Sequence, residues 1–221
     1  MMGMLDEVPR GLRDVPSVSD ALTSLRNGTP VVVGALPWAF VMINGRSALA
    51  ANAAALIRHG SGLLHVALEA RRIRALGIPP MPVDSGSRCP HAHVAVDASA
   101  GITTGISAAD RAETIRRLSN SASRPQDFIR PGHVLPVVAE LIPSSEPANV
   151  ALVLSALAGS SPPAAAYCAL VSPVRPTELA DVSEAPRLAA TLGYAYLSAE
   201  EVIAAFYRYM PTIQETSRCQ P

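Results

Sequence analysis

The chain has 221 residues, of which 49% are hydrophobic and only 4% aromatic, so its length suits one large domain with a core of aliphatic side chains. Its 18 basic and 18 acidic residues give a formal net charge of zero, and because no block of like charge stands out we expect no nucleic-acid partner. All the basic residues are arginines, which excludes chemistry that needs a lysine, such as Schiff-base catalysis.

The cysteines and the apolar segments place the chain among soluble proteins. Cys89, Cys168 and Cys219 show no paired spacing, so we expect no disulfide framework. The first ten residues lack the apolar run of a signal peptide, and the longest apolar run, residues 31–43, is too short to cross a bilayer. We therefore expect a cytoplasmic protein without a membrane partner.

The predicted elements alternate between helices and strands along the chain. After a flexible leader at residues 1–16 we expect one domain over residues 17–210 and a disordered tail over residues 211–221. Capping-box patterns predict that helices begin at Ser17 and Ser107, and a third capping pattern predicts that the last helix begins at Ser198. The expected helices are residues 17–27, 48–57, 69–76, 107–118, 148–158, 184–192 and 198–209, and the expected strands are residues 31–33, 63–67, 91–97, 164–171 and 194–197. Residues 79–90 and most of 119–133 are expected to be loop. This alternation predicts a single mixed-sheet domain of the α/β (α+β) class.

Two motifs carry a specific resemblance to a known family. One is GITTGISAADR at residues 101–111, and the other is RPGHV at residues 130–134. Shorter matches are RHGSGL at residues 58–63 and LGIPPM at residues 76–81. With these motifs the chain resembles the 3,4-dihydroxy-2-butanone 4-phosphate synthase family over roughly residues 17–209. The resemblance implies a mixed α/β fold and a homodimer whose active site lies near the subunit interface.

The resemblance also implies a reaction, and three segments depart from what that reaction requires. The family converts ribulose 5-phosphate into formate and the four-carbon precursor of riboflavin, with a divalent metal, usually Mg²⁺. Residues 34–43 carry no charge where the family has an acidic metal-binding loop. Pro147 and Asn149 stand at the positions of a metal-binding His and a Glu, and Ala169 stands where a Glu transfers protons. We therefore expect no metal and no cofactor, and we disfavour the family's reaction.

Four histidines are the candidate catalytic residues: His65, His91, His93 and His133. If the expected strand reaches back far enough, Cys89, His91 and His93 point to the same face. One interpretation is a transition-metal site of the zinc type. A second is metal-free acid–base catalysis by the imidazoles, whose pKa lies near working pH. A third is that they are ordinary strand residues, and His133 can equally hold its own turn or contact a partner subunit.

The candidate substrate-binding residues are Thr103, Thr104, Arg130, Trp38 and Cys89. The two threonines offer hydroxyl groups, although a strand-to-helix turn favours such residues in any case. Arg130 can face a ligand or form an ion pair at a subunit interface. Trp38 begins an apolar wall that replaces the metal loop, unless it is simply part of the core.

From these departures we expect a repurposed family member. It would perform a Mg²⁺-independent reaction of the lyase, isomerase or cyclase type on a less polar small-molecule substrate, in specialised (natural-product) metabolism. The alternative is a catalytically inactive homologue that binds a ligand or stabilises a partner. Whether the protein is an enzyme is thus left open, with an enzyme favoured. The state of the family's cavity separates the two interpretations, because catalysis needs an open space with converging polar groups.

Overall fold

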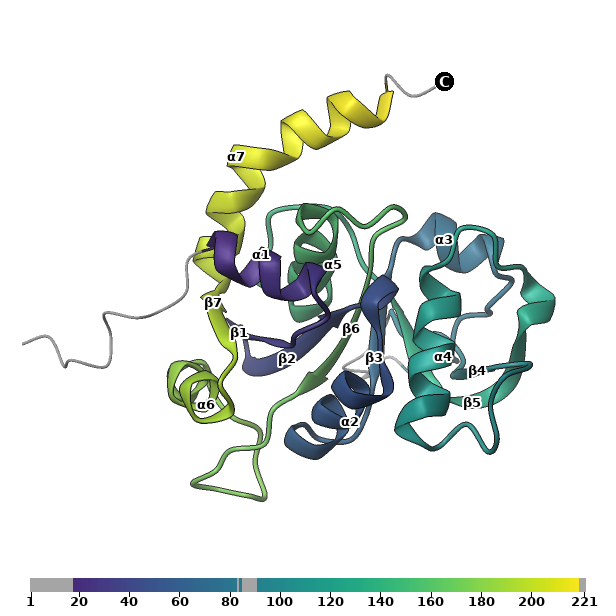
Figure 1. Ribbon diagram of the computed structural model, residues 1–221, viewed down its shortest axis with the longest axis horizontal. Helices are drawn as coiled ribbons and strands as arrows, with labels where there is room; N and C mark the ends of the chain where they lie inside the picture. The colour runs from purple at the N-terminus through teal and green to yellow at the C-terminus, as the bar shows by residue number, and fades with distance from the viewer. Residues whose placement is uncertain (1–17, 83, 85–90, 219–221) are drawn as a thin grey trace, which may run out of the picture.

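The computed structural model describes residues 18–82, 84 and 91–218. Helices and strands alternate along these residues, as Figure 1 shows. The α-helices are α1 (Val18–Arg26), α2 (Ala50–His59), α3 (Ala70–Ala75), α4 (Ala108–Ser119), α5 (Pro147–Leu157), α6 (Ala185–Leu192) and α7 (Ala199–Arg218). The strands are β1 (Val31–Ala35), β2 (Trp38–Asn44), β3 (His65–Leu68), β4 (Val96–Ala98), β5 (Phe128–Val138), β6 (Ala164–Ala169) and β7 (Ala195–Ser198). Short 3₁₀ turns η2 (Gly45–Ser47), η3 (Pro125–Asp127) and η4 (Val182–Glu184) link some of them.

The strands of the described residues form one seven-stranded sheet in the order β4-β5-β3-β6-β2-β1-β7. The β1–β2 pair is an antiparallel hairpin in which Val31 lies opposite Met42. The pairs β1–β7 and β3–β5 are parallel, and the other neighbours are antiparallel. The sheet is therefore mixed, which confirms the expected fold class.

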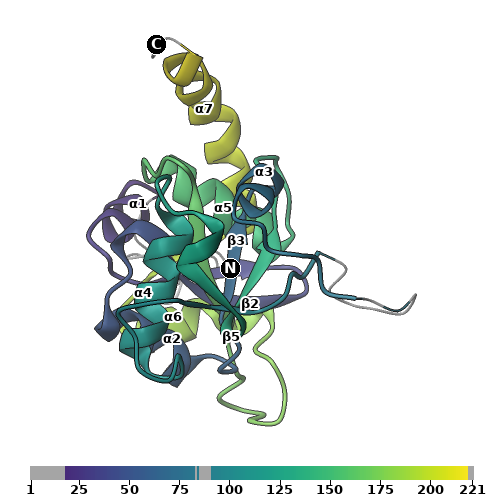
Figure 2. The same cartoon turned by 90° about the vertical axis from the view of Figure 1, so that its right-hand side faces the viewer.

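Both faces of the sheet are covered by helices. Along β2, Phe40 and Met42 belong to one apolar cluster, while Val41 and Ile43 belong to the other, as the two-residue period of a strand requires. The first cluster includes side chains of α1, α5 and α7, and the second includes those of α2, α4 and α6. Figures 1 and 2 show the same division of the helices. Because both faces are buried, the central strands are apolar throughout.

Helix α5 is the most deeply buried helix of the fold. All eleven of its residues are buried, from Pro147 to Leu157. Pro147 occupies the first turn, where the missing N–H costs nothing. A helix that is apolar on all sides is held by its neighbours on every side, so the position of its first turn in the molecule is fixed.

The helix caps agree with the sequence where they are described. The Ser107 hydroxyl accepts a hydrogen bond from the Asp110 backbone N–H at 3.1 Å. At α7, Ser198 Oγ accepts from the Glu201 N–H at 3.2 Å, and the Glu201 carboxylate accepts from the Ser198 N–H at 2.8 Å. The first predicted box begins at Ser17, which lies outside the described residues.

Several element boundaries differ from the prediction. Strand β2 was not predicted, because a strand buried on both faces loses the alternation of polar and apolar residues that marks a strand with one exposed face. Strand β5 begins at Phe128, within a segment predicted as loop, because its first half pairs only with short β4. Helix α7 continues to Arg218, where the sequence predicts a disordered tail.

The strand predicted at residues 91–97 is reduced to β4, residues 96–98. The preceding residues run beside β5 without forming a regular ladder. The His93 N–H donates to the Pro136 carbonyl at 2.9 Å, the Val138 N–H donates to the His91 carbonyl at 3.0 Å, and Ala92 forms an isolated bridge with Val137. Cys89 lies outside the described residues, so the expected convergence of Cys89, His91 and His93 stays a prediction.

None of the described helices combines the length and the apolar character that a membrane crossing requires.

Candidate functional site

A cavity of about 780 Å³ opens where several elements end on one side of the sheet. The β1–β2 turn contributes residues 36–38, the segment entering β3 contributes residues 61–65, and the approach to α5 contributes residues 144–148. The remaining wall comes from β5, β6, His91 and Leu179. We call this space the main pocket. Its volume is that of a small-molecule site.

His65 and Tyr167 form the aromatic wall of the main pocket. Their rings are stacked, with centroids 5.1 Å apart and planes at 19°. Burial lowers the pKa of His65, so its imidazole is neutral at ordinary pH and able to accept a proton. The Nδ1 atom of His65 and the Nε1 atom of Trp38 are buried without a hydrogen-bond partner. Such groups are unusual in a folded protein and mark places where a polar ligand can be bound after a small movement.

The opposite wall is the approach to α5, and its charge comes from Glu146. Asn149, one turn into the helix, donates from Nδ2 to Glu146 Oε2 at 3.2 Å and to Ser144 Oγ at 3.4 Å. Its side-chain oxygen accepts from the Glu140 N–H at 2.8 Å. Asn149 therefore ties this approach to the helix, and a carboxylate rather than a basic group faces the pocket.

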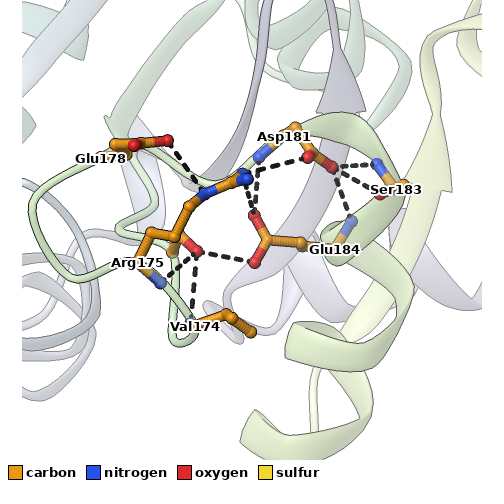
Figure 3. A network of polar contacts seen from close by, with 7 residues as sticks. Val174, Arg175, Glu178, Asp181, Ser183 and Glu184 are labelled. Atoms are coloured by element: carbon orange, nitrogen blue, oxygen red, sulfur yellow. Dashed lines mark hydrogen bonds and ion pairs between the residues drawn. The ribbon is translucent and has the colours of Figure 1, made fainter.

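The mouth of the main pocket includes Leu179, which lies in a loop held by Arg175. The Arg175 guanidinium contacts three carboxylates, at 2.9 Å from Glu178, 3.5 Å from Asp181 and 3.9 Å from Glu184 (Figure 3). A hydrogen bond from the Ser183 hydroxyl is the largest of the effects that lower the pKa of Asp181. The exposed guanidinium of Arg175 thus contacts the carboxylates of Glu178, Asp181 and Glu184.

The four candidate histidines fall into different places. His65 and His91 both line the main pocket. His93 does not line it, and its Nδ1 lies 3.3 Å from the His91 carbonyl oxygen. His133 lies outside it as well, on the exposed side of β5. Of the four candidates, His65 and His91 therefore share the main pocket, and His93 and His133 do not line it.

His133 instead belongs to a second polar group beside the turn at residues 101–107. Its Nδ1 lies 2.7 Å from Asp97 Oδ2, and its backbone N–H donates to Asp97 Oδ1 at 2.9 Å. Asp97 is 3% exposed. A Cβ atom at Gly105 would lie 2.0 Å from Asp97 Oδ2 and 2.8 Å from His133 Nδ1, so only glycine fits at this point of the turn.

The candidate substrate-binding residues of this region have structural partners. The Thr103 hydroxyl donates to Asp110 Oδ2 at 2.9 Å, and its backbone N–H donates to Asp110 Oδ1 at 3.1 Å. The Arg130 guanidinium donates to the Leu76 carbonyl at 3.0 Å. Thr104 is exposed. Of the five candidates, Trp38 alone lines the main pocket among the described residues, Cys89 being outside them.

The residues around the main pocket do not fit the divalent metal that the resemblance implies. Magnesium prefers several oxygen ligands, typically carboxylates. The described wall carries one carboxylate, from Glu146, and the side-chain oxygen of Asn149 already accepts a backbone N–H. Pro147 offers no side-chain ligand. In the described part of the chain, no group of three or more His, Cys, Asp or Glu residues is arranged to hold a metal ion.

A mixed sheet covered by helices, with a pocket of small-molecule size among its described residues, is the arrangement of an α/β domain that can bind a small molecule. A family model for 3,4-dihydroxy-2-butanone 4-phosphate synthase matches residues 19–205. The chain belongs to this family.

Relatives and solved structures agree with this assignment. The 3,4-dihydroxy-2-butanone 4-phosphate synthase of Chromobacterium violaceum is 38% identical over 164 residues, which is 71% of this chain and 78% of the relative. That of Chlorobium limicola is 31% identical, over 87% of this chain and 89% of the relative. A solved synthase in complex with two magnesium ions has a TM-score of 0.79 at 29% identity, covering 88% of this chain and 98% of the other.

These comparisons correct the function expected from the sequence. Three relatives that are 38%, 43% and 31% identical to this chain carry the name of the synthase. Nothing among them supports a repurposed reaction, an inactive ligand-binding role or a place in natural-product metabolism. The expectation of a repurposed enzyme rested on three departures, at residues 34–43, at Pro147 and Asn149, and at Ala169. The loss of these groups does not reveal what the pocket binds.

Sequence reasoning missed Tyr167 and Asp97, both of which contact a candidate histidine. Tyr167 lies opposite His65 in the β3–β6 ladder, a pairing that no local pattern signals. Asp97 and His133 are 36 residues apart. The available signal for Asp97 was an acidic residue at the end of an apolar strand, because a buried carboxylate needs a partner.

Proposed function

We propose that this chain forms 3,4-dihydroxy-2-butanone 4-phosphate, the product after which its relatives are named, and that the substrate binds in the main pocket. The observation that carries the proposal is the main pocket itself, open and lined by two imidazoles, in a fold shared with a solved synthase. The substrate that the family resemblance implies is ribulose 5-phosphate. A cavity of about 780 Å³ has room for a sugar phosphate of this size.

The chain's own residues supply proton-transfer groups to this pocket. His65 is neutral, because burial lowers its pKa, and is therefore suited to accept a proton. His91 is exposed at the rim, and Glu146 brings a carboxylate to the opposite wall. Because the described residues do not fit a divalent metal, no step of the proposal passes through one. We propose that the metal ligands implied by the resemblance are absent from this pocket.

The test is release of formate from ribulose 5-phosphate by the purified chain, measured by ion chromatography with Mg²⁺ and with EDTA. Formate release both with Mg²⁺ and with EDTA would support the reaction and the proposal that the metal ligands are absent. Formate release with Mg²⁺ alone would support the reaction and refute the proposal that the metal ligands are absent. No formate in either condition refutes the proposed reaction. Trp38 is the single tryptophan and lines the main pocket, so its fluorescence reports substrate binding separately from turnover.

A matched pair of variants tests the location. His91→Gln changes a residue of the main pocket, and His93→Gln changes a residue two positions away that does not line it. We expect His91→Gln to lower kcat/KM by about tenfold or more, as loss of a proton-transfer group does, and His93→Gln to have little effect. Equal activity of the two variants would place the reaction elsewhere.

We also propose that the chain works as a homodimer, as the resemblance implies. Two large apolar side chains near Asp97 support this: Ile106 is 55% exposed and Ile129 is 50% exposed. Ile129 lies opposite Asp97 in the ladder with β4, at the edge of the sheet. Sedimentation equilibrium should give a dimer for the wild type and a monomer for the double change Ile106→Asp and Ile129→Asp. A location in the cytoplasm stays a prediction from the sequence.

A further inference from the structure

A second cavity, of about 290 Å³, lies at the other end of strand β2 from the main pocket. Its walls are Arg46 of η2, the C-terminal end of α4 at Arg116 and Ser119, the following residues 120–121, and Ser161 of the loop before β6. Trp38 begins β2 in the main pocket, and this seven-residue strand ends beside the second cavity. At about 3.3 Å per residue the two sites are roughly 20 Å apart.

We propose that this second cavity binds a phosphate group, as inorganic phosphate or as a small phosphate ester. Arginine from two separate segments faces the space, and hydroxyl and amide side chains supply further hydrogen-bonding groups. Phosphate is the anion that suits such a set, because its oxygens accept several hydrogen bonds and the planar guanidinium binds two of them at once.

The local charge is positive. Arg46 is exposed, and the only described hydrogen bond of its side chain is from Nη1 to the Ser161 carbonyl, at 3.2 Å. Arg116 donates to the Ala48 carbonyl at 2.7 Å and is paired with Glu113. Glu113 is shared with Arg117, whose Nε lies 2.8 Å from it. The described lining of the cavity thus holds two guanidinium groups and no carboxylate, and the carboxylate paired with Arg116 is shared with Arg117.

The end of α4 would ordinarily repel an anion, since carbonyl groups gather at a helix C-terminus. Here Arg72 covers those carbonyls from the other side. It is 8% exposed, and its guanidinium donates to the carbonyls of Leu118, at 3.1 Å, and Asn120. This buried cation offsets the negative end of the helix, so the positive charge of the cavity is not cancelled.

The floor of the cavity is fixed by buried hydrogen bonds. Asn44 is 4% exposed, and its side-chain oxygen accepts from Ser160 Oγ at 2.6 Å and from the Arg46 N–H at 3.4 Å. Ser119 is 1% exposed and donates from Oγ to the Ile115 carbonyl at 2.8 Å. Preformed groups lose little freedom on binding, which favours even a small ligand.

The size of the cavity limits the ligand. A water molecule takes about 30 Å³ in the liquid, so 290 Å³ corresponds to roughly ten waters. That is enough for inorganic phosphate or for a short phosphate ester, and too little for a nucleotide. The main pocket has no arginine in its described lining. Variants of the arginines of the second cavity therefore distinguish phosphate bound there from phosphate bound in the main pocket.

The experiment is isothermal titration of the full-length chain with sodium phosphate and, separately, with glycerol 3-phosphate, at low ionic strength and with acetate as a control anion. We expect saturable binding of one phosphate group per chain and none of acetate. Arg46→Gln should weaken it by about tenfold or more, because a charge-assisted hydrogen bond is lost, and Arg46→Lys should weaken it less. Binding of both ligands points to the phosphate group alone, and binding of the ester alone points to a phosphorylated metabolite.

Two further variants make the test specific. Arg187→Gln removes the same charge from exposed α6, which contributes nothing to the cavity, and should bind phosphate as the wild type does. Ser161→Asp places a carboxylate in the cavity and should abolish binding. No saturable binding in the wild type, equal loss in Arg187→Gln, or full binding by Arg46→Gln would overturn the proposal. Circular dichroism of each variant confirms that the fold is intact.

Discussion

The part of β5 that presents His133 depends on Gly132, and replacing this glycine by alanine tests how closely β4 and β5 are packed. A Cβ atom there would lie 2.1 Å from the Val96 carbonyl carbon and 2.3 Å from the Asp97 nitrogen. Ordinary contact begins at 3.4 Å, so the two backbones would have to separate by about 1.3 Å. The atoms in the way are backbone, which cannot rotate aside as a side chain does.

The expected cost follows from what that separation breaks. The Gly132 N–H donates to the Ala95 carbonyl at 2.9 Å, and loss of one such bond costs about 1 kcal/mol. Forced overpacking adds about 1–3 kcal/mol. We therefore expect Gly132→Ala to lower the free energy of unfolding by about 2–4 kcal/mol, a large part of the total for a domain of this size. The bond from the His133 N–H to Asp97 should weaken with it.

The assay is urea denaturation followed by circular dichroism, with Gly159→Ala as the matched control. Gly159 has a φ of +88° and nothing within 4 Å of its Cβ position. Alanine there meets only the backbone strain of the left-handed region, about 1 kcal/mol. If Gly132→Ala loses no more stability than Gly159→Ala, then β4 and β5 are not packed as described and the reasoning fails.

Three other predictions follow from the titrating and charged groups. Burial lowers the pKa of His65 below 6.5, so as the pH falls below 6.5 the unfolded chain binds a proton at this residue before the folded chain does. The free energy of unfolding of the wild type should therefore fall more between pH 7 and about pH 5 than that of His65→Phe. Equal losses in the two proteins would contradict a neutral His65. Hydrogen bonds, with that from the Thr103 N–H first, lower the pKa of Asp110, so its carboxylate stabilises the fold above pH 3.8 and this contribution fades as the pH falls toward the lower folded-state pKa. Asp110→Asn should have a lower Tm than the wild type at neutral pH, and the difference in Tm should narrow only below pH 3.8. A difference in Tm that does not change with pH would count against this reasoning. Because the Arg175 side chain is 51% exposed, Arg175→Gln should lower the free energy of unfolding by less than about 1 kcal/mol. Amide hydrogen exchange in residues 172–184 should nevertheless accelerate. Unchanged exchange would show that the ion pairs do not hold the loop.

The parts of the fold that the sequence predicted are those decided by local chemistry. The caps at Ser107 and Ser198 require only a hydroxyl, a few backbone N–H groups and the residues next along the chain. The family motifs led to the fold class for a related reason, since some of their glycines lie where neighbouring atoms leave no space for a Cβ, as at Gly105 in a turn and Gly132 in β5.

The candidate site was predicted only in part, because its residues meet through pairing of distant strands. His65 and His91 were chosen as histidines of the cavity, and both line the main pocket. His133 was grouped with them, yet it turns toward Asp97, a contact set by the β4–β5 register. Register is a property of the whole sheet, so a pattern along one segment does not determine which residues face the same space.

Helix α5 has a consequence for altering this protein by design. Because its eleven residues are enclosed by the fold, the backbone that supports the approach to the main pocket is anchored independently of the residues on that approach. Substitutions at Ser145 should therefore change what the pocket accepts at little cost in stability. Substitutions at Glu146 also remove a hydrogen bond from Asn149, which costs about 1 kcal/mol. Large-to-small changes from Val150 onward should cost about 2–5 kcal/mol. Selection for new ligands can therefore be directed at a few consecutive side chains that precede a rigid, buried helix.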